Sequence, residues 1–224
     1  MKMKTLGAFA VIVPLVSACD VEQPLPQCTV GRGEHAVRYT LVSGSGACAN
    51  KTAEIVGMQI FRTPGSGIPP SVEFKPAPLA ANEGKDVDNP VSASGDFTTE
   101  YPGDEGLCEA PAFSEARQRV AQSNGTTVEL RYQWSNLRVQ GSAAIPGTQW
   151  TADLEYSEAE CSATYRAVGM FPALRCLRNG VRDPSVCQQP QPGLSIDPAF
   201  PTRCDESTNL CVLSGEPPSL IPQR

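Results

Sequence analysis

The chain has 224 residues, of which 18 are basic and 24 acidic, so its formal charge is −6 at neutral pH. This acidic balance argues against nucleic acid as a partner, because proteins that bind nucleic acid carry basic surfaces. The chain holds a single histidine, which excludes a cluster of imidazole ligands, and we expect neither a metal site nor a cofactor.

Residues 1–18 are predicted to be a lipoprotein signal peptide. Lys2 and Lys4 form a basic start, and the apolar stretch at 6–16 is well short of the ~20 residues that span a bilayer. The sequence then runs Leu-Val-Ser-Ala-Cys and ends at Cys19. The small residues before the cysteine suit a protease site, and the Cys19 thiol can accept a diacylglyceryl group. The alternative is an ordinary secretory signal beside an incidental cysteine.

Lipidation at Cys19 predicts a protein that sits on a membrane without crossing it, since two or more acyl chains hold firmly where one binds weakly. Cleavage leaves 206 residues with 16 basic and 24 acidic side chains, a formal charge of −8. Residues 19–27, with two prolines, are expected to be a lipidated tether. We expect a location in the bacterial cell envelope, facing the periplasm or the cell surface. Asp20 does not decide which membrane holds the lipid, and we favour the outer one.

Residues 28–170 are expected to form a β domain. From His35 to Val42 apolar and polar residues alternate, which is typical of a half-buried strand. Residues 54–61 are apolar on both faces and predict a strand that is covered on both sides. Two shorter strands are predicted at 71–75 and 96–101, within an otherwise loop-like region.

The next region is predicted to contain a short helix and then three strands. Phe113, Ala116 and Val120 have helical spacing, which predicts a helix at 113–122. Strict alternation follows at residues 127–134, 150–156 and 161–167, with a bulge or strand end expected near Ser135 and Asn136. Successive strands joined by turns indicate a mostly β fold, either an antiparallel β-sandwich or a partly open barrel with long loops.

Residues 171–224 are predicted to be a cysteine-rich, proline-rich appendage and tail, in which cross-links replace burial because apolar residues are few. With Cys19 assigned to lipid, an even number of cysteines remains, and no pair has the C-x-x-C spacing of zinc or redox sites. Their connectivity stays open, although the short steps from Cys176 to Cys187 and from Cys204 to Cys211 favour local loops. The disulfide candidates are Cys28, Cys48, Cys108, Cys161, Cys176, Cys187, Cys204 and Cys211.

No catalytic group of residues is recognised. His35, the lone histidine, lies in register with the apolar face of its strand, so a structural role is favoured over a catalytic base. Asp86-Val87-Asp88-Asn89 offers alternate oxygen donors but lacks the rest of an EF-hand loop, so solvated loop acids are favoured over calcium. Trp134 and Trp150 could floor a ligand pocket, but core packing explains them as well. The wider set of loop acids is Asp86, Asp88, Asp96, Glu100, Asp104, Glu105 and Glu109.

The chain resembles the MlpA-type cell-envelope lipoproteins of myxobacteria. The matching segments are Cys-Thr-Val-Gly-Arg-Gly at 28–33, Tyr-Thr-Leu at 39–41, and residues 161–176 with Phe-Pro-Ala at 171–173. The resemblance spans about residues 1–176. It implies a lipid-anchored envelope protein with no established activity and no catalytic residues to transfer.

We therefore expect a lipid-anchored envelope protein with a structural or binding role and not an enzyme. Its partners would be the membrane, through the lipid, and an envelope protein or polymer. Two alternatives remain open. One is a hydrolase of envelope or extracellular polymers that uses the loop acids, and the other is a carrier of a small hydrophobic ligand.

Overall fold

The computed structural model describes residues 27–63, 66–103, 105–121, 123–141, 146–188, 201–217 and 220, so the predicted signal peptide and Cys19 lie outside the described residues. The elements of the first part are β1 (Gly33–Gly44), β2 (Ala53–Phe61), β3 (Ser71–Pro76), helix α1 (Ala77–Ala80), β4 (Ala93–Asp96), β5 (Leu107–Ala121), β6 (Thr127–Gly141), β7 (Pro146–Glu158) and β8 (Cys161–Met170). The appendage holds β9 (Leu177–Arg178), β10 (Val181–Arg182), β11 (Thr202–Cys204) and β12 (Cys211–Leu213). Two 3₁₀ turns lie at Gly46–Asn50 and Pro184–Gln188.

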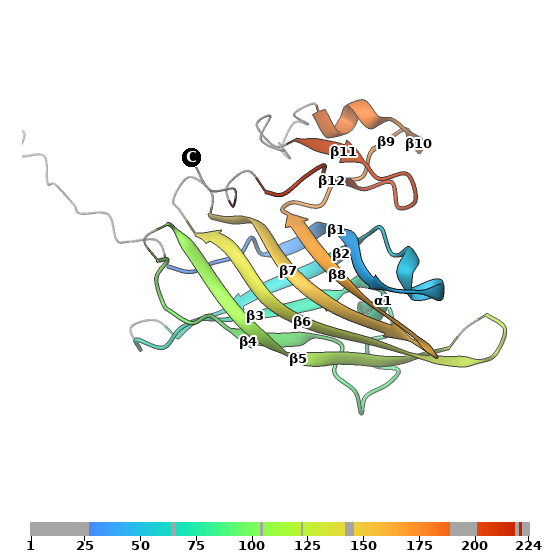
Figure 1. Ribbon diagram of the computed structural model, residues 1–224, viewed down its shortest axis with the longest axis horizontal. Coiled ribbons are helices and arrows are strands. Elements are labelled where there is room, and N and C mark those ends of the chain that lie inside the picture. The colour runs from blue at the N-terminus through green and yellow to red at the C-terminus, as the bar shows by residue number, and fades with distance from the viewer. Residues whose placement is uncertain are drawn as a thin grey trace, which may run out of the picture.

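The first eight strands form one antiparallel sheet in the order β4-β3-β2-β1-β8-β7-β6-β5. Consecutive strands pair from β1 to β4 and again from β5 to β8, and β1 also pairs with β8, so the sheet is an up-and-down meander with β4 and β5 at its edges. The sheet curls until its edge strands β4 and β5 meet, which gives a nearly closed barrel (Figure 1). The seam has only a few bonds, including Thr98 N to Glu109 O at 2.9 Å and Arg117 N to Pro90 O at 2.8 Å.

Large side chains fill the interior of the barrel. The inward faces of β6 and β7 bring Trp134 and Trp150 into edge-to-face contact, with ring centroids 6.2 Å apart. The Phe74 ring of β3 contacts both indoles at about 5 Å. Tyr132 and Tyr165 are also fully buried. The alternation that predicted these strands is therefore the inward and outward alternation of a packed barrel.

Both ends of the barrel are covered. At one end residues 27–32 lie across the opening, where Cys28 and Val30 are buried and a disulfide joins Cys28 to Cys108. At the other end the turn after β1 is joined to the start of β8 by the Cys48–Cys161 disulfide. Helix α1 adds Leu79 to the core on the side of β5.

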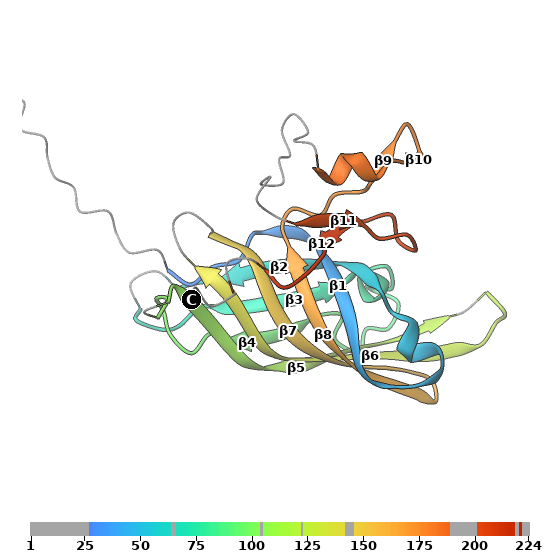
Figure 2. The same cartoon turned by 45° about the horizontal axis from the view of Figure 1, so that its top comes forward.

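The appendage packs on the outer face of β1 and β8 (Figure 2). A second apolar cluster joins Val168 and Met170 of β8 to Leu210 and Val212 of the appendage. The Arg38 guanidinium adds hydrogen bonds to Leu213 O at 2.8 Å and to Gly215 O at 3.1 Å. The appendage is thus held by shared burial as well as by cross-links, which corrects the expectation that cross-links replace burial.

The helix predicted at 113–122 is wrong, because these residues belong to strand β5. A bulge between Ala112 and Glu115 shifts the pairing with β6. Phe113 and Ala116 are three residues apart, so a regular strand would place them on opposite faces of the sheet. Because of the bulge both face the core, and this gives them the spacing expected of a helix.

The strand predicted at 96–101 is also misplaced, since β4 covers Ala93–Asp96. Its partner β3 begins at Ser71, which pairs with Asp96. Beyond Asp96 the ladder therefore has no partner strand to continue it. By contrast, the bulge expected near Ser135 and Asn136 in β6 is confirmed by a register shift between Ser135 and Arg138.

Candidate functional site

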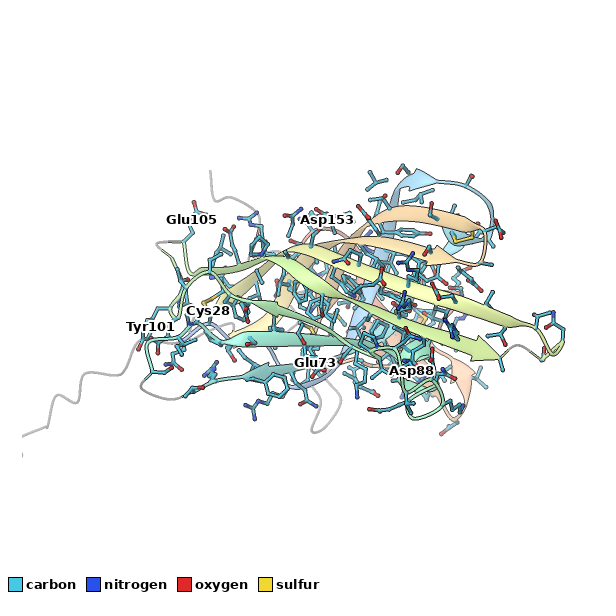
Figure 3. All side chains as sticks on the ribbon, turned by 90° about the horizontal axis from the view of Figure 1, so that it is seen from below. Cys28, Glu73, Asp88, Tyr101, Glu105 and Asp153 are labelled. Atoms are coloured by element: carbon cyan, nitrogen blue, oxygen red, sulfur yellow. A yellow bond between two sulfur atoms is a disulfide. The ribbon has the colours of Figure 1, made fainter. Side chains whose placement is uncertain are left out.

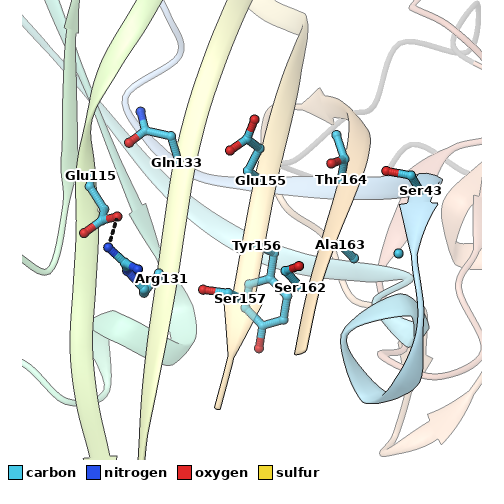
Figure 4. Close-up of a pocket in the computed structure, with 11 residues that line it drawn as sticks. Ser43, Glu115, Arg131, Gln133, Glu155, Tyr156, Ser157, Ser162, Ala163 and Thr164 are labelled. Carbon is cyan, nitrogen blue, oxygen red and sulfur yellow. Dashed lines mark ion pairs between the residues drawn. The ribbon is translucent and has the colours of Figure 1, made fainter. Parts of the chain in front are cut away.

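The outer face of the barrel has a polar hollow of about 380 Å³ over strands β5, β6, β7, β8 and β1 (Figure 4). It lies toward the end of the barrel at which β1 ends and the β7–β8 turn is found. The residues that line it are Ser43, Gly44, Glu115, Arg131, Gln133, Glu155, Tyr156, Ser157, Ser162, Ala163 and Thr164.

Strand register aligns the polar side chains of the hollow in rows. Gln133 of β6 pairs with Glu115 on one side and with Glu155 of β7 on the other. Thr164 of β8 then pairs with Glu155 and with Ser43 of β1. The result is a continuous row across five strands, as Figure 4 shows. Neighbouring strands of a sheet lie about 4.8 Å apart.

In a second row below the first, the small side chains of Ser157 and Ser162 create the depth of the hollow. Arg131 pairs with Ser157, and Ser157 pairs with Ser162. Because two serines stand where longer side chains would fill the space, the centre of the face is depressed between the flanks. Arg131 forms the charged flank and makes an ion pair with Glu115 at 2.9 Å.

Glu155 is the open charged group of the hollow. Its side chain is exposed, and no hydrogen bond or ion pair joins its carboxylate to any other described residue. Glu115, by comparison, is neutralised by Arg131. The hydroxyl groups around Glu155, on Ser157 and Thr164, can both donate and accept hydrogen bonds. The hollow can therefore bind a polar group that carries donors or a positive charge.

The sequence analysis did not identify this site. The polar parity of β6, β7 and β8 was visible in the sequence, and it marked Gln133 and Glu155 as outward facing. What the sequence lacked was the register that aligns these strands and the pairing of β1 with β8. These depend on turns and on closure of the barrel and not on local pattern.

His35 is a structural residue, as favoured from the sequence, and it is fully buried. Its Nε2 lies 2.7 Å from Gly31 O, and its Nδ1 lies 3.0 Å from Trp150 Nε1. The indole can only donate, so Nδ1 accepts and Nε2–H donates to the carbonyl. Burial lowers the pKa of His35 to about 4, against the bond to Gly31, which raises it. Because both ring nitrogens have partners inside the protein, neither faces solvent as a base.

A charged cluster lies inside the barrel beside the turn after β1. Lys51 Nζ contacts Glu54 Oε2 at 2.6 Å and lies about 5 Å from the ring centroids of Tyr39, Tyr132 and Tyr156. The hydroxyl groups of Tyr39 and Tyr132 donate to the Glu54 carboxylate. Burial and the negative charge of Glu54 raise the pKa values of both phenols. The Lys51 ammonium group already occupies the space between these rings and the Glu54 carboxylate. The cluster is therefore a stabilising ion pair surrounded by aromatic side chains.

The loop acids do not form one site. Figure 3 shows Asp88 at one end of the barrel and Glu105 at the other. The Asp86 carboxylate accepts from Asn89 Nδ2 in its own loop and from Arg119 N in β5. Asp104 lies outside the described residues. No group of three or more acids in the described part of the chain converges as metal ligands would.

Four disulfides join all eight candidate cysteines. In the barrel they are Cys28–Cys108 and Cys48–Cys161, and in the appendage Cys176–Cys204 and Cys187–Cys211. The local pairs expected between Cys176 and Cys187 and between Cys204 and Cys211 are therefore wrong. Cys204 and Cys211 are opposite residues on β11 and β12, but each bonds to a cysteine outside that hairpin. The sulfurs of Cys176, Cys187 and Cys211 lie within 4.8 Å of one another, yet as disulfides they are not thiolate metal ligands.

The chain is similar to proteins of one known family. The MlpA profile matches residues 33–172. A Myxococcus xanthus protein named "Putative lipoprotein MlpA" is 29% identical over 222 residues, which cover 92% of this chain and 92% of that protein. No solved structure matches. No helix among the described residues is long and apolar enough to cross a membrane. Since the matched residues contain all eight strands of the barrel, the chain belongs to the MlpA family.

Proposed function

We propose that the mature chain is a cell-envelope lipoprotein, held on a membrane by lipid at Cys19, with a binding role. The observation that carries the anchoring is the Leu-Val-Ser-Ala-Cys motif at the end of a basic and apolar N-terminus. The lipoprotein name of the Myxococcus xanthus relative supports it, because that relative matches over 92% of both chains. The four disulfides also suit an exported protein, since such bonds persist in oxidising compartments.

Metabolic labelling with a palmitate analogue tests the anchor. The wild-type protein should take the label and float with membranes, and the Cys19→Ala protein should do neither. Lys2→Ala is the matched control, because Lys4 keeps a positive charge at the N-terminus and the cysteine remains. Equal labelling of the Cys19→Ala protein would refute lipidation at this residue.

The binding role is supported by where the open polar surface lies. The barrel interior is filled by the contact between Trp134, Trp150 and Phe74, and both barrel ends are covered. This argues against carriage of a hydrophobic ligand, which needs an enclosed cavity between the two tryptophans. The hollow around Glu155 is open instead and presents unpaired polar groups. A donor-rich or cationic group of an envelope component fits it.

Photo-crosslinking in cells tests this role. p-Benzoylphenylalanine in place of Ser43, an exposed residue at the β1 edge of the hollow, places the probe beside the site without filling it, and the same residue in place of Gln59 places it on the exposed outer face of β2. A specific adduct is expected from position 43 only. Adding Glu155→Gln should reduce its yield, whereas Glu160→Gln in the adjacent turn should not. Equal adducts at both positions, or none at either, would contradict a binding site in the hollow.

The geometry does not favour a hydrolase. Paired-carboxylate hydrolysis requires two acids within about 10 Å across a cleft. Asp88 and Glu105 lie at opposite ends of the barrel, and Glu109 makes an ion pair with Arg138 at 3.2 Å. In the hollow, Glu115 is already paired with Arg131, which leaves Glu155 without a second free acid.

A further inference from the structure

The N-terminal tether enters the barrel at one end, which we call the tether end and define by residues 27–32, 61–63, 66–70 and 97–103. Cys28 N donates to Glu100 O at 2.9 Å, and Arg62 Nη2 donates to Cys28 O at 2.8 Å. Gly31 N also bonds to Gly147 O at 2.9 Å. These bonds fix Gln27, the first described residue, at the tether end.

The tether end and the adjoining end of β2 expose large apolar side chains. Phe61 at the end of β2 is 51% exposed, Ile68 in the β2–β3 loop 64%, and Tyr101 in the β4–β5 loop 42%. Figure 3 shows Tyr101 beside Cys28 at this end and Asp88 at the opposite end. Two of the three are aromatic, the residue class that concentrates where a protein meets lipid head groups.

Charged groups at this end are of both signs. Arg32 and Arg62 are exposed cations, and each also donates to a backbone carbonyl, of Ile60 and Cys28 respectively. Glu100 accepts from Gln27 Nε2 at 2.7 Å, and Asp96 and Glu105 are exposed. Arginine side chains can extend their charge to head-group phosphates while their stems cover apolar surface. The apolar contact and not net charge is therefore the main attraction.

The tether length limits how far this end can lie from a lipid at Cys19. Eight residue-to-residue steps lead from Cys19 to Gln27, and at most 3.6 Å per step gives a reach of at most about 29 Å. Strands β5 and β6 have 15 residues each, and at 3.3 Å per residue they extend roughly 46 Å toward the other end. The tether end is thus the part of the fold that the anchor holds near the bilayer.

We propose that the tether end docks on the bilayer surface through Phe61, Ile68 and Tyr101, so that the barrel stands on the membrane. This inference rests on the proposed lipidation of Cys19. It also has a consequence for the polar hollow, which lies toward the opposite end of β7 and β8. Docking at the tether end would hold the hollow away from the lipid, where an envelope component can reach it.

Depth-dependent fluorescence quenching tests the docking. Ile68→Trp and Tyr101→Trp are made in the full lipidated chain and placed in phosphatidylethanolamine vesicles with a minor share of phosphatidylglycerol. Brominated acyl chains in the vesicles quench only indoles that reach the lipid. The matched controls are Val42→Trp and Val87→Trp, which are 66% and 81% exposed away from the tether end. The native Trp134 and Trp150 are fully buried and give the background.

The added indole at position 68 or 101 should be quenched several-fold more strongly than at position 42 or 87. If the lipidated protein floats with the vesicles but neither tether-end indole is quenched, docking is refuted and anchoring stands. Equal quenching at both ends also refutes docking, because the barrel would then have no preferred orientation. Absence of the lipid label from the wild-type protein would instead refute the anchor, and the docking inference with it.

Discussion

The indole of Trp150 on β7 donates a hydrogen bond of 3.0 Å to Nδ1 of His35 on β1, and this bond links strands that are not neighbours in the sheet. The other ring nitrogen of His35 donates to Gly31 O, in the segment that covers the tether end. The imidazole thus ties three parts of the fold together in one fixed tautomer. Protonation of Nδ1 would abolish its role as an acceptor and place a charge in the core.

The imidazole of His35 should remain neutral in the folded protein at pH 5. Burial lowers its pKa to about 4 from the ordinary 6.5. As the chain has one histidine, its ring protons give one identifiable set of NMR signals. These signals should show no titration step between pH 8 and 5. A midpoint near 6.5 in the folded state would contradict the buried, doubly bonded geometry.

The same residue predicts a loss of stability on acidification. Between pH 6.5 and about 4 the unfolded chain binds a proton at His35 that the folded chain does not, so the free energy of unfolding falls as the pH falls through this window. The contribution, fully present above pH 6.5, is about 3 kcal/mol. Urea unfolding at several pH values measures it. Carboxylates also titrate in this range, so the wild-type protein is compared with His35→Gln. The slope of the unfolding free energy against pH should be smaller in the variant, by an amount that corresponds to at most one proton.

Gly169 on β8 should not tolerate even a methyl group. A Cβ there would lie 2.1 Å from the indole of Trp150, its partner in the sheet register. Gly169→Ala must displace the ring and with it the bond to His35, so we expect destabilisation of about 3 kcal/mol. Gly215→Ala is the control, since nothing lies within 4 Å of its added Cβ. Denaturation midpoints of the two variants give the comparison, and similar values would disprove the close contact.

Lys51 and Glu54 should be strongly coupled. Their side chains are 13% and 8% exposed, so removal of either partner leaves an unpaired charge among the tyrosines. Lys51→Met or Glu54→Gln alone should cost about 3 kcal/mol. The double variant should recover a large part of that loss, because the amide still accepts from Tyr39 and Tyr132. A double-mutant cycle by urea unfolding measures the coupling, and additive losses would mean that the two charges act independently.

The two sets of disulfides should contribute unequally. Cys48–Cys161 has a sequence separation of 113 residues and Cys187–Cys211 one of 24. On a chain-entropy basis their removal costs about 5 and about 3 kcal/mol respectively. The paired alanine variants should rank in that order by chemical denaturation. The appendage variant should in addition speed hydrogen exchange at Val168, while the interior amides near Trp134 stay protected. The reverse ranking would show that native packing outweighs loop length.

Much of the barrel could be predicted from alternation alone. Strands β6, β7 and β8 carry strict periodicity because each has one packed and one wet face, and the bulge at Asn136 is visible as a parity change. β5 was misassigned because the bulge between Ala112 and Glu115 turns alternation into helical spacing.

The candidate site was less accessible to sequence analysis. Glu155 could be placed on an outward face, but its neighbours Gln133 and Thr164 follow from register across three strands. Likewise, Cys204 and Cys211 look like a local pair and are opposite residues of the β11–β12 hairpin, but they bond to Cys176 and Cys187 respectively. The local alternation of residues shows which side of a strand a residue faces. The pairing of strands far apart in the sequence decides which of these residues become neighbours.

The division of the disulfides into two sets affects the order in which they can form during the proposed export of the chain. Both barrel bonds close between residues 28 and 161, and both appendage bonds close between 176 and 211. A chain that leaves a translocation channel from its N-terminus can finish the first set before the second emerges. Eight cysteines that oxidise together have roughly a hundred possible disulfide connectivities, whereas two separate sets of four have about nine. The order of cysteines along the chain thus limits misoxidation during secretion.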